Sequence, residues 1–112
     1  VAAQVREMLV SVTEEGTGRR AAIEGYTIAG KTGTAQQVVD GAYSQTDYWA
    51  SFVGFVPAED PVFGMIVIID RPRGLRTGGA VSAPVFSRLA LVVARYLELP
   101  VAVPTDAEQD TL

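Results

Sequence analysis

Cysteine, histidine and asparagine are absent from the 112 residues of the chain. A chain without cysteine forms no disulfide and no thiolate metal site. A chain that also lacks histidine cannot by itself build the usual zinc centres or a catalytic triad that depends on an imidazole. We therefore expect a protein that uses neither a metal nor another cofactor.

Positive charge and long apolar runs are scarce as well. The formal net charge is −4, which argues against binding to nucleic acid through a basic surface. No apolar stretch approaches the roughly 20 residues that a membrane-spanning helix needs. What remains is the composition of a globular protein, with 48% hydrophobic and 20% charged residues, and a length that allows one modest core.

The N-terminal segment has the pattern of a helix and not that of a secretory signal. Hydrophobic residues recur at helical spacing from Val1 to Val12, and no charged segment followed by an apolar core is present. The first residue is not methionine. We interpret the chain as a piece of a longer polypeptide.

Apolar patterning predicts two helices that enclose three strands. Alternating and β-branched residues are typical of strands, whereas a spacing of three to four is typical of helices. Asp40-Gly41 is a hairpin signal between the first two strands. The predicted elements are a helix over 1–12, strands over 26–39, 49–58 and 62–70, and a helix over 80–99. Residues 100–112, which are acidic and contain proline, are predicted to form a flexible tail.

This order indicates an α+β fold, an antiparallel sheet flanked by N-terminal and C-terminal helices that share one face. The third strand is apolar on both faces, so we predict that it is the central one. Ser82 is expected to cap the final helix, and Trp49 to pack in the core or the hairpin. An apolar stripe of the final helix is expected to face the core, and it comprises Val85, Leu89, Val92, Val93 and Tyr96.

The only lysine of the chain lies in the segment IAGKTGTAQQ. In a regular strand, Lys31 and Gly33 would face one side, and Thr32 and Thr34 the other. An ammonium group, two hydroxyls and backbone N–H groups left accessible by glycine together suit an anion or a developing oxyanion. The same four residues also fit an exposed edge strand with solubilising side chains, so the short motif alone leaves both interpretations open.

Longer stretches separate these alternatives. The segments GTGRRAAIEGYTIAGKTGTAQ, YWASFVGFVPAEDPVFGMIVIID and GGAVSAPVFSRLA resemble the C-terminal part of the transpeptidase domain of class B penicillin-binding proteins, whose third signature motif is K-T-G. The resemblance covers residues 1–99. It implies a β-lactamase/transpeptidase-like fold and a peptidoglycan D,D-transpeptidase of the division or elongation type. Such an enzyme cross-links the cell wall by serine acyl transfer and binds β-lactams.

The resemblance also implies a role for each residue of the motif. Lys31 would supply positive charge next to the nucleophile and take part in proton transfer. Thr32 and Thr34 would hydrogen-bond the carboxylate of the stem peptide or of a β-lactam, and Gly33 would let the substrate lie along the strand. The backbone N–H of Thr34 would be one of two oxyanion donors. The expected catalytic residues are thus Lys31 and Thr34.

Two other signature motifs of the family are missing. No serine is followed by lysine at the third position, and S-x-N cannot exist without asparagine. The chain alone is therefore expected to be inactive, to expose a large apolar surface and not to be a stable monomer. Its implied partners are the N-terminal remainder of the domain with S-x-x-K and S-x-N, the peptidoglycan stem peptide, β-lactams and other cell-wall synthesis proteins. The family implies a place on the periplasmic face of the bacterial inner membrane.

Two other function classes share such a fold: a penicillin-sensing receptor that is acylated without turnover, and a non-catalytic module that offers the lysine strand as an edge to a partner protein. Three local features also stay open. The GTG segment at 16–18 either ends the first helix through its glycine pair or contacts substrate, as the family resemblance would allow. The arginines of RPRGLRTGG at 71–79 form a solvated loop or attract an anionic polymer. Gly78 and Gly79 allow either a close approach to the lysine strand or a flexible entry to the last helix.

Overall fold

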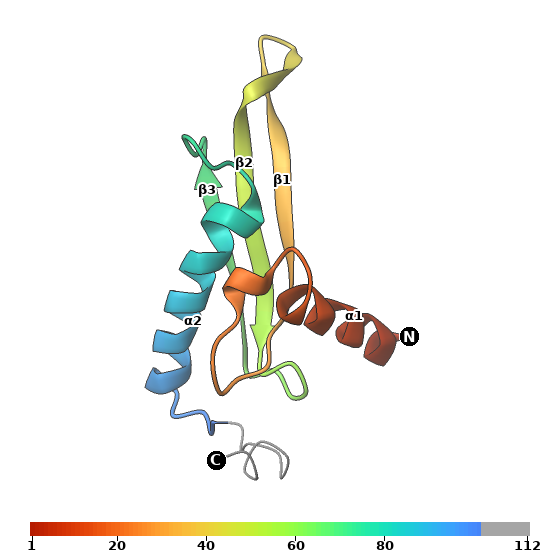
Figure 1. Ribbon diagram of the computed structural model, residues 1–112, viewed down its shortest axis with the longest axis vertical. Coiled ribbons are helices and arrows are strands. Elements are labelled where there is room, and N and C mark those ends of the chain that lie inside the picture. Colours follow the sequence, from red (N-terminus) through yellow and green to blue (C-terminus); the bar gives the residue numbers. More distant parts are fainter. Residues whose placement is uncertain (102–112) are drawn as a thin grey trace.

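The computed structural model describes residues 1–101, and the structural statements below concern that part of the chain. Helix α1 spans Ala2–Glu14 and is followed by the short helix η1 at Arg19–Ala21. Three strands come next, and they are β1 (Ala29–Val39), β2 (Ala42–Val56) and β3 (Phe63–Asp70). Helices η2 (Gly78–Ser82) and α2 (Ala83–Tyr96) complete the fold (Figure 1). The predicted α+β order is confirmed, and the predicted tail lies outside the described residues from 102 on.

The three strands form an antiparallel sheet in the order β1-β2-β3. The prediction that the third strand is central is wrong, because β2 occupies that place. Strand β3 is apolar on both faces for a different reason. Val67 faces the core, whereas Ile66 and Ile68 point to the other side and are 57% and 55% exposed. An apolar pattern on an edge strand here marks a face that the described residues leave uncovered.

Helix α2 covers one face of the sheet through its smallest residues. Ala83, Ala90 and Ala94 are fully buried, and the ring of Phe86 meets that of Phe52 edge-on with 4.7 Å between centroids. Small side chains let the helix approach the sheet closely, so the buried stripe is alanine-rich. The predicted core stripe is wrong in this respect. Most of its members are exposed, and these are Val85, Leu89, Val92 and Tyr96.

Ser82 is the residue that precedes α2, as predicted, but its hydroxyl does not cap the helix. It is buried and donates a hydrogen bond of 2.8 Å to the carbonyl of Ala50 in β2. The cap in this region is Thr77, whose hydroxyl accepts from the N–H of Ala80 at 3.2 Å. Ser82 therefore ties the start of α2 to the centre of the sheet.

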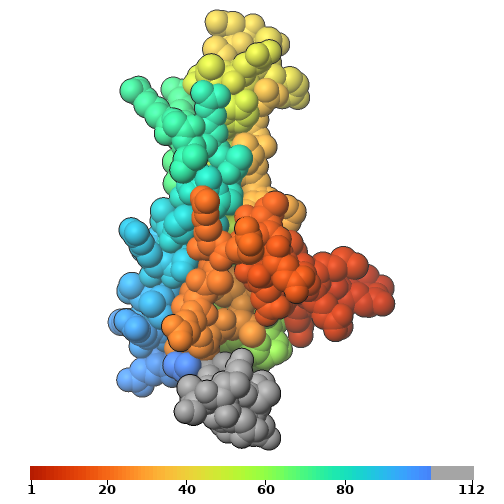
Figure 2. All heavy atoms as spheres, in the orientation of Figure 1, coloured from red at the N-terminus to blue at the C-terminus, as the bar shows by residue number. Residues whose placement is uncertain are grey.

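Helix α1 lies at the edge of the sheet and projects away from the body (Figures 1 and 2). The hydroxyl of Thr13 donates to the carbonyl of Ile28 at 2.6 Å, which fixes the end of α1 beside the start of β1. Gly18 fills the narrow space between Val12 and Phe52, on the face that α2 covers. Leu9, one turn earlier, lines a cavity that contains Val53, a residue of the opposite face. The expectation that both long helices share one face holds only for the C-terminal end of α1.

The first two strands form a hairpin that is longer than predicted. Its turn is Asp40-Gly41, as expected, and both residues have positive φ angles of 52° and 81°. Strand β2 begins at Ala42 instead of residue 49 because the polar segment after the turn continues the ladder, with Val39 opposite Ala42. Polar residues are compatible with a strand at this end because solvent reaches it from several sides, and Tyr43 is 73% exposed.

The opposite face of the sheet, here called the open face, carries apolar side chains that residues 1–101 leave largely uncovered, with only Leu9 of α1 near one end. Its residues share a register across the three strands, and they are Lys31, Gly33, Trp49, Ser51, Val53, Ile66 and Ile68. Val53 is 48% exposed and Trp49 is 44% exposed. Of the two positions expected for Trp49, the core is therefore wrong, and the residue lies in the β1–β2 hairpin opposite Ala35. The expected exposure of a substantial apolar surface is confirmed.

Candidate active site

The lysine strand is an edge strand with two chemically different sides. Within residues 1–101, β1 pairs only with β2, and Lys31 stands opposite Val53 while Thr32 stands opposite Phe52. Because directly opposed residues share a face, Lys31 belongs to the open face and Thr32 and Thr34 to the face that η2 and α2 cover. The predicted alternation of the motif is confirmed. Within residues 1–101, the unpaired edge of β1 separates the face that carries Lys31 from the face that carries Thr32 and Thr34.

The lysine side chain does not extend away from the sheet. Its Nζ atom lies 3.3 Å from the carbonyl oxygen of Thr32 and 3.5 Å from the Thr32 hydroxyl. Lys31 therefore bends around the edge of β1 and brings its positive charge to the threonine side. The lysine and the threonine hydroxyl reach a common point at the strand edge although their side chains start on opposite faces.

The hydroxyl of Thr34 is held by the backbone of η2. The N–H of Gly78 donates to Thr34 Oγ1 at 3.0 Å. A hydroxyl has one proton to donate and two lone pairs, so this bond leaves the proton of Thr34 available to another acceptor. The arrangement turns Thr34 into an oriented hydrogen-bond donor, which is the property needed to bind a carboxylate.

The absence of a side chain at Gly78 explains how η2 approaches the strand so closely. A Cβ atom on Gly78 would lie 2.2 Å from the carbonyl oxygen of Ser51 and 2.6 Å from that of Gly33. A Cβ atom on Gly33 would lie 2.6 Å from the Ser51 hydroxyl. Gly78 therefore serves close approach to the lysine strand rather than flexibility. Gly33 has a packing reason of its own, namely the Ser51 side chain on the neighbouring strand.

A polar cavity of about 420 Å³ opens beside the two threonines. It is lined by Thr32 and Thr34 from β1, by Thr77 next to η2, and by Thr17 and the two arginines of the segment after α1. The hydroxyls of Thr17 and Thr32 are 3.2 Å apart. Hydroxyls and guanidinium groups around one cavity provide several donors for an oxyanion.

The sequence patterns did not identify Thr17, Arg19 and Arg20 as part of this cavity. The GTG segment does follow the end of α1, where the N–H of Gly18 donates to the carbonyl of Val12 at 3.0 Å. The same turn places the hydroxyl of the intervening Thr17 3.2 Å from the Thr32 hydroxyl. The end of the helix at this segment is confirmed, whereas its contact with substrate stays a prediction. A threonine between two glycines just before two arginines was the available signal.

A second cavity, of about 460 Å³, lies on the other side of the lysine strand. Its lining is mainly apolar, with Leu9 from α1, Val53 and Phe55 from β2, and Ile66 from β3 beside Lys31. An ammonium group that is buried among apolar side chains loses hydration without gaining a hydrogen-bond acceptor. The bend of Lys31 brings its ammonium group to the oxygens of Thr32 instead. Apolar groups on this side suit packing against protein more than binding of a polar ligand.

The described part of the chain shows neither a metal-binding cluster nor a membrane-spanning helix. Residues 1–101 bring together no group of three or more acidic side chains that would hold a metal ion. No helix there is long and apolar enough to span a membrane.

Comparison with known proteins relates this geometry to a family. Residues 1–91 match the penicillin binding protein transpeptidase domain. Stage V sporulation protein D of Bacillus subtilis is 48% identical over 87 residues, which cover 77% of this chain and 14% of that protein. The peptidoglycan D,D-transpeptidase FtsI of Buchnera aphidicola is 42% identical over 97 residues, which cover 85% of this chain and 17% of that protein.

Solved structures agree with the sequence matches. The transpeptidase domain of Burkholderia pseudomallei penicillin-binding protein 3 superposes with a TM-score of 0.78 at 42% identity, over 88% of this chain and 30% of that one. Penicillin-binding protein 3 of Mycobacterium tuberculosis, complexed with ampicillin, has a TM-score of 0.78 at 33% identity and covers 91% of this chain. The chain spans less than a third of each of these proteins. The chain belongs to the penicillin-binding protein transpeptidase family.

Proposed function

We propose that the chain is the C-terminal part of a peptidoglycan D,D-transpeptidase domain that cross-links stem peptides and is acylated by β-lactams. The observation that carries the proposal is the position of the Lys31 ammonium group beside the Thr32 hydroxyl at the edge of β1, with the oriented hydroxyl of Thr34 lining the same polar cavity as Thr32. Relatives with D,D-transpeptidase names and a relative in complex with ampicillin support the same reaction class.

In the proposed reaction, the chain binds and polarises while a serine outside it attacks. The serine oxygen forms an ester with the penultimate D-alanine carbonyl, and the C–N bond to the last D-alanine breaks as that amine takes a proton. An amine of a second stem peptide then attacks the ester, and the serine recovers its proton. Lys31, at the strand edge, would lower the cost of the negative charge that develops near the serine.

The two threonines would hold the carboxylate of the leaving D-alanine. Thr34 donates its free proton, Thr32 adds a second hydroxyl, and the unpaired edge of β1 along Gly33 receives the peptide as an added strand. The backbone N–H of Thr34 would be one oxyanion donor, and such a donor typically contributes about 100- to 1,000-fold to the rate. A β-lactam carries a carboxylate too, which explains why it would occupy the same place.

The remainder of the domain is the proposed partner of the open face. That remainder would contribute the serine and lysine of S-x-x-K and the S-x-N motif, since this chain contains neither. The apolar cavity beside Lys31 and the exposed Val53 and Ile66 offer the surface on which it would pack. We expect the chain alone to be inactive and not to be a stable monomer. As in the family, we place the whole protein on the periplasmic face of the inner membrane with other cell-wall synthesis proteins.

Intact-mass analysis after exposure to penicillin tests this proposal. The complete polypeptide that contains the chain should gain the mass of one penicilloyl group, because the serine ester of a β-lactam hydrolyses slowly. Lys31→Ala should slow the acylation at least 100-fold. Arg88→Ala, which also removes one positive charge but from the exposed surface of α2, is the matched control and should acylate at the wild-type rate.

Two results would contradict the proposal. If the wild type forms no adduct, the acyltransferase assignment is wrong. The lysine strand would then serve as an edge that binds a partner protein. Equal rates in Lys31→Ala and Arg88→Ala would remove Lys31 from the site. An adduct that forms normally, without transfer of the acyl group to an added amine acceptor, would instead identify a penicillin-sensing receptor.

A further inference from the structure

A third cavity, of about 280 Å³, lies beyond the lysine strand, between β2 and the loop after β3. Its lining includes Arg71, Arg73 and Arg76 from the loop and Thr46 and Asp47 from β2. We refer to it as the arginine pocket. Three of the eight arginines of the chain line it, although the net charge of the whole chain is −4.

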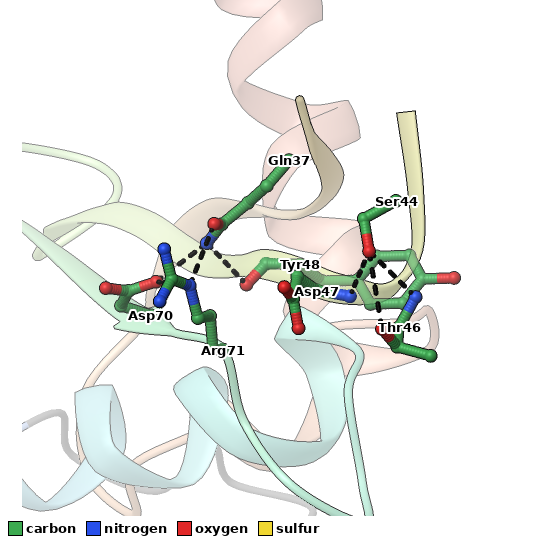
Figure 3. Close-up of polar contacts among 7 residues, drawn as sticks. All are labelled: Gln37, Ser44, Thr46, Asp47, Tyr48, Asp70 and Arg71. Carbon is green, nitrogen blue, oxygen red and sulfur yellow. Dashed lines mark hydrogen bonds and ion pairs between the residues drawn. The ribbon is translucent and has the colours of Figure 1, made fainter. Parts of the chain in front are cut away.

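One wall of the pocket is built by an irregularity in β2. Gln36 pairs with Tyr48 and Val38 pairs with Tyr43, so one residue of β1 faces four residues of β2. The hydroxyl of Ser44 accepts from the N–H groups of Thr46 and Asp47, at 3.1 and 2.9 Å (Figure 3). This turn displaces residues 44–47 from the regular ladder and places Thr46 and Asp47 in the wall of the cavity.

The opposite wall is anchored by the unpaired residue of β1. Gln37 is only 6% exposed, and its amide nitrogen donates to Asp70 at 2.7 Å while its amide oxygen accepts from Arg71 Nε at 3.1 Å (Figure 3). Arg71 also has a φ angle of 53°, which is uncommon for a residue other than glycine. Its N–H donates to the carbonyl of Tyr48 at 2.9 Å. Backbone and side chain of Arg71 are thus both held in place.

The ends of two guanidinium groups are left available. The bond to Gln37 uses Nε of Arg71, and within residues 1–101 its two terminal nitrogens have no hydrogen-bond partner. The Cζ atom of Arg76 lies 5.7 Å from the centroid of the Tyr48 ring. One terminal nitrogen of Arg76 donates a hydrogen bond of 3.4 Å to the carbonyl of Gln45. Among the described residues, Arg71 keeps both terminal nitrogens free and Arg76 keeps one, so the two guanidinium groups can together bind a planar anion.

The charges around the pocket restrict which anion fits. Three guanidinium groups face two carboxylates, since Asp47 lines the pocket and Asp70 is 3.6 Å from Arg71. The sum is one positive charge, which suits a single negative charge and not two. A cavity of about 280 Å³ lies just below the range of about 300–1,000 Å³ that is typical of drug-sized ligand sites, so it suits a small anion.

We propose that the arginine pocket binds a carboxylate group that carries a single negative charge. The pocket adjoins the candidate active site, because only Thr77, which lines the polar cavity, separates Arg76 from Gly78, whose N–H holds Thr34. The inference does not depend on the proposed transpeptidase reaction, since it concerns a different cavity and a binding event.

Chemical protection of arginine tests the proposal on the complete polypeptide. Phenylglyoxal modifies accessible guanidinium groups, and mass spectrometry of peptides reports each arginine separately. N-acetylglycine is the carboxylate probe, and inorganic phosphate, mostly a dianion at mildly alkaline pH, is the competing anion. N-acetylglycine should protect Arg71, Arg73 and Arg76 in a saturable way. Arg88 and Arg95, which are exposed on α2, are controls within the same molecule.

Three variants sharpen the test. Arg71→Gln and Arg76→Gln should each raise the apparent dissociation constant about tenfold or more, the usual effect of losing a hydrogen bond to a charged group. Asp47→Asn should improve protection by phosphate several-fold, because it removes the carboxylate that opposes a second negative charge.

Equal protection of all five arginines, or no saturable protection of the three pocket arginines in the wild type, would overturn the proposal. Stronger protection by phosphate than by N-acetylglycine in the wild type would overturn the assignment to a single carboxylate. Penicillin acylation measured on the same samples separates the two proposals. Loss of acylation with intact protection would count only against the transpeptidase function, and the reverse result only against the pocket.

Discussion

Both faces of the sheet carry apolar side chains, but the two faces differ in what covers them. On one face, Phe52 and Val67 are buried under α2, whose Phe86 fills the space between helix and sheet. On the other, Ile66 and Val53 are about half exposed. A sheet that is apolar on both faces requires two covering layers. The described chain supplies one of them, and the difference between the faces indicates where the second belongs.

The largest expected effect concerns the covered face. Phe86→Ala removes a fully buried ring and its edge-on contact with Phe52, so it should lower the free energy of unfolding by about 4 kcal/mol. Urea unfolding of the complete polypeptide, followed by circular dichroism, measures this value. Tyr96→Ala removes a ring of the same helix that is 84% exposed, and it should change stability by less than about 0.5 kcal/mol. Similar losses in the two variants would contradict the described orientation of α2.

The next effect concerns the contact between η2 and the lysine strand. Gly78→Ala places a methyl group 2.2 Å from the carbonyl oxygen of Ser51, and backbone cannot move aside as a flexible side chain can. We expect a loss of about 3 kcal/mol and a marked loss of penicillin acylation, because the bond to Thr34 would be displaced. Gly74→Ala, which meets backbone strain at a φ angle of 80° but nothing within 4 Å of its added methyl group, is a comparison for acylation. Unchanged acylation in Gly78→Ala would show that the hold on Thr34 is dispensable.

A smaller effect tests whether the open face is covered in the complete protein. Ile66→Ala should cost about 2 kcal/mol there, as at a buried position, if the remainder of the domain packs on this face. At a position that stays 57% exposed, the same change would cost less than about 0.5 kcal/mol. The same urea titration distinguishes the two values. The lower value would mean that the two faces remain different in the whole protein.

The smallest effect is expected at the hairpin turn, where neither face is covered. Gly41 has a φ angle of 81° and empty space around it, so Gly41→Ala meets backbone strain but no clash. The cost should be about 1 kcal/mol. Penicillin acylation should be unchanged. An effect as large as that of Gly78→Ala would mean that the turn contacts something outside the described residues.

The sequence was sufficient for the elements and for the alternation of the motif. Helical spacing, β-branched runs and Asp40-Gly41 are local signals, and each predicted an element that is present. The sheet order and the buried side of α2 depend on tertiary packing, which local patterns do not report. Leu89 is a better core residue than Ala90 by hydropathy alone, yet the close approach of helix to sheet admits only the smaller side chain.

The same distinction holds for the candidate site. Lys31, Thr32, Gly33 and Thr34 are adjacent in sequence, and their resemblance to a family motif identified them together. Thr17 and Gly78 reach the strand from distant segments, and only the fold brings them there. The buried Gln37 had no local signal, because its bonds depend on the irregular pairing of β1 with β2.

That irregular pairing has a consequence for the design of reporters. Pairing resumes at Val38 and Tyr43 after the register shift. The short ladder next to the turn therefore has a different register from the regular ladder that carries Lys31. A peptide tag or a fluorescent amino acid inserted between Asp40 and Gly41 would alter the register only of the two residue pairs beyond the break. The turn is therefore a suitable attachment point for following the protein in cells without disturbing the strand on which its proposed chemistry would depend.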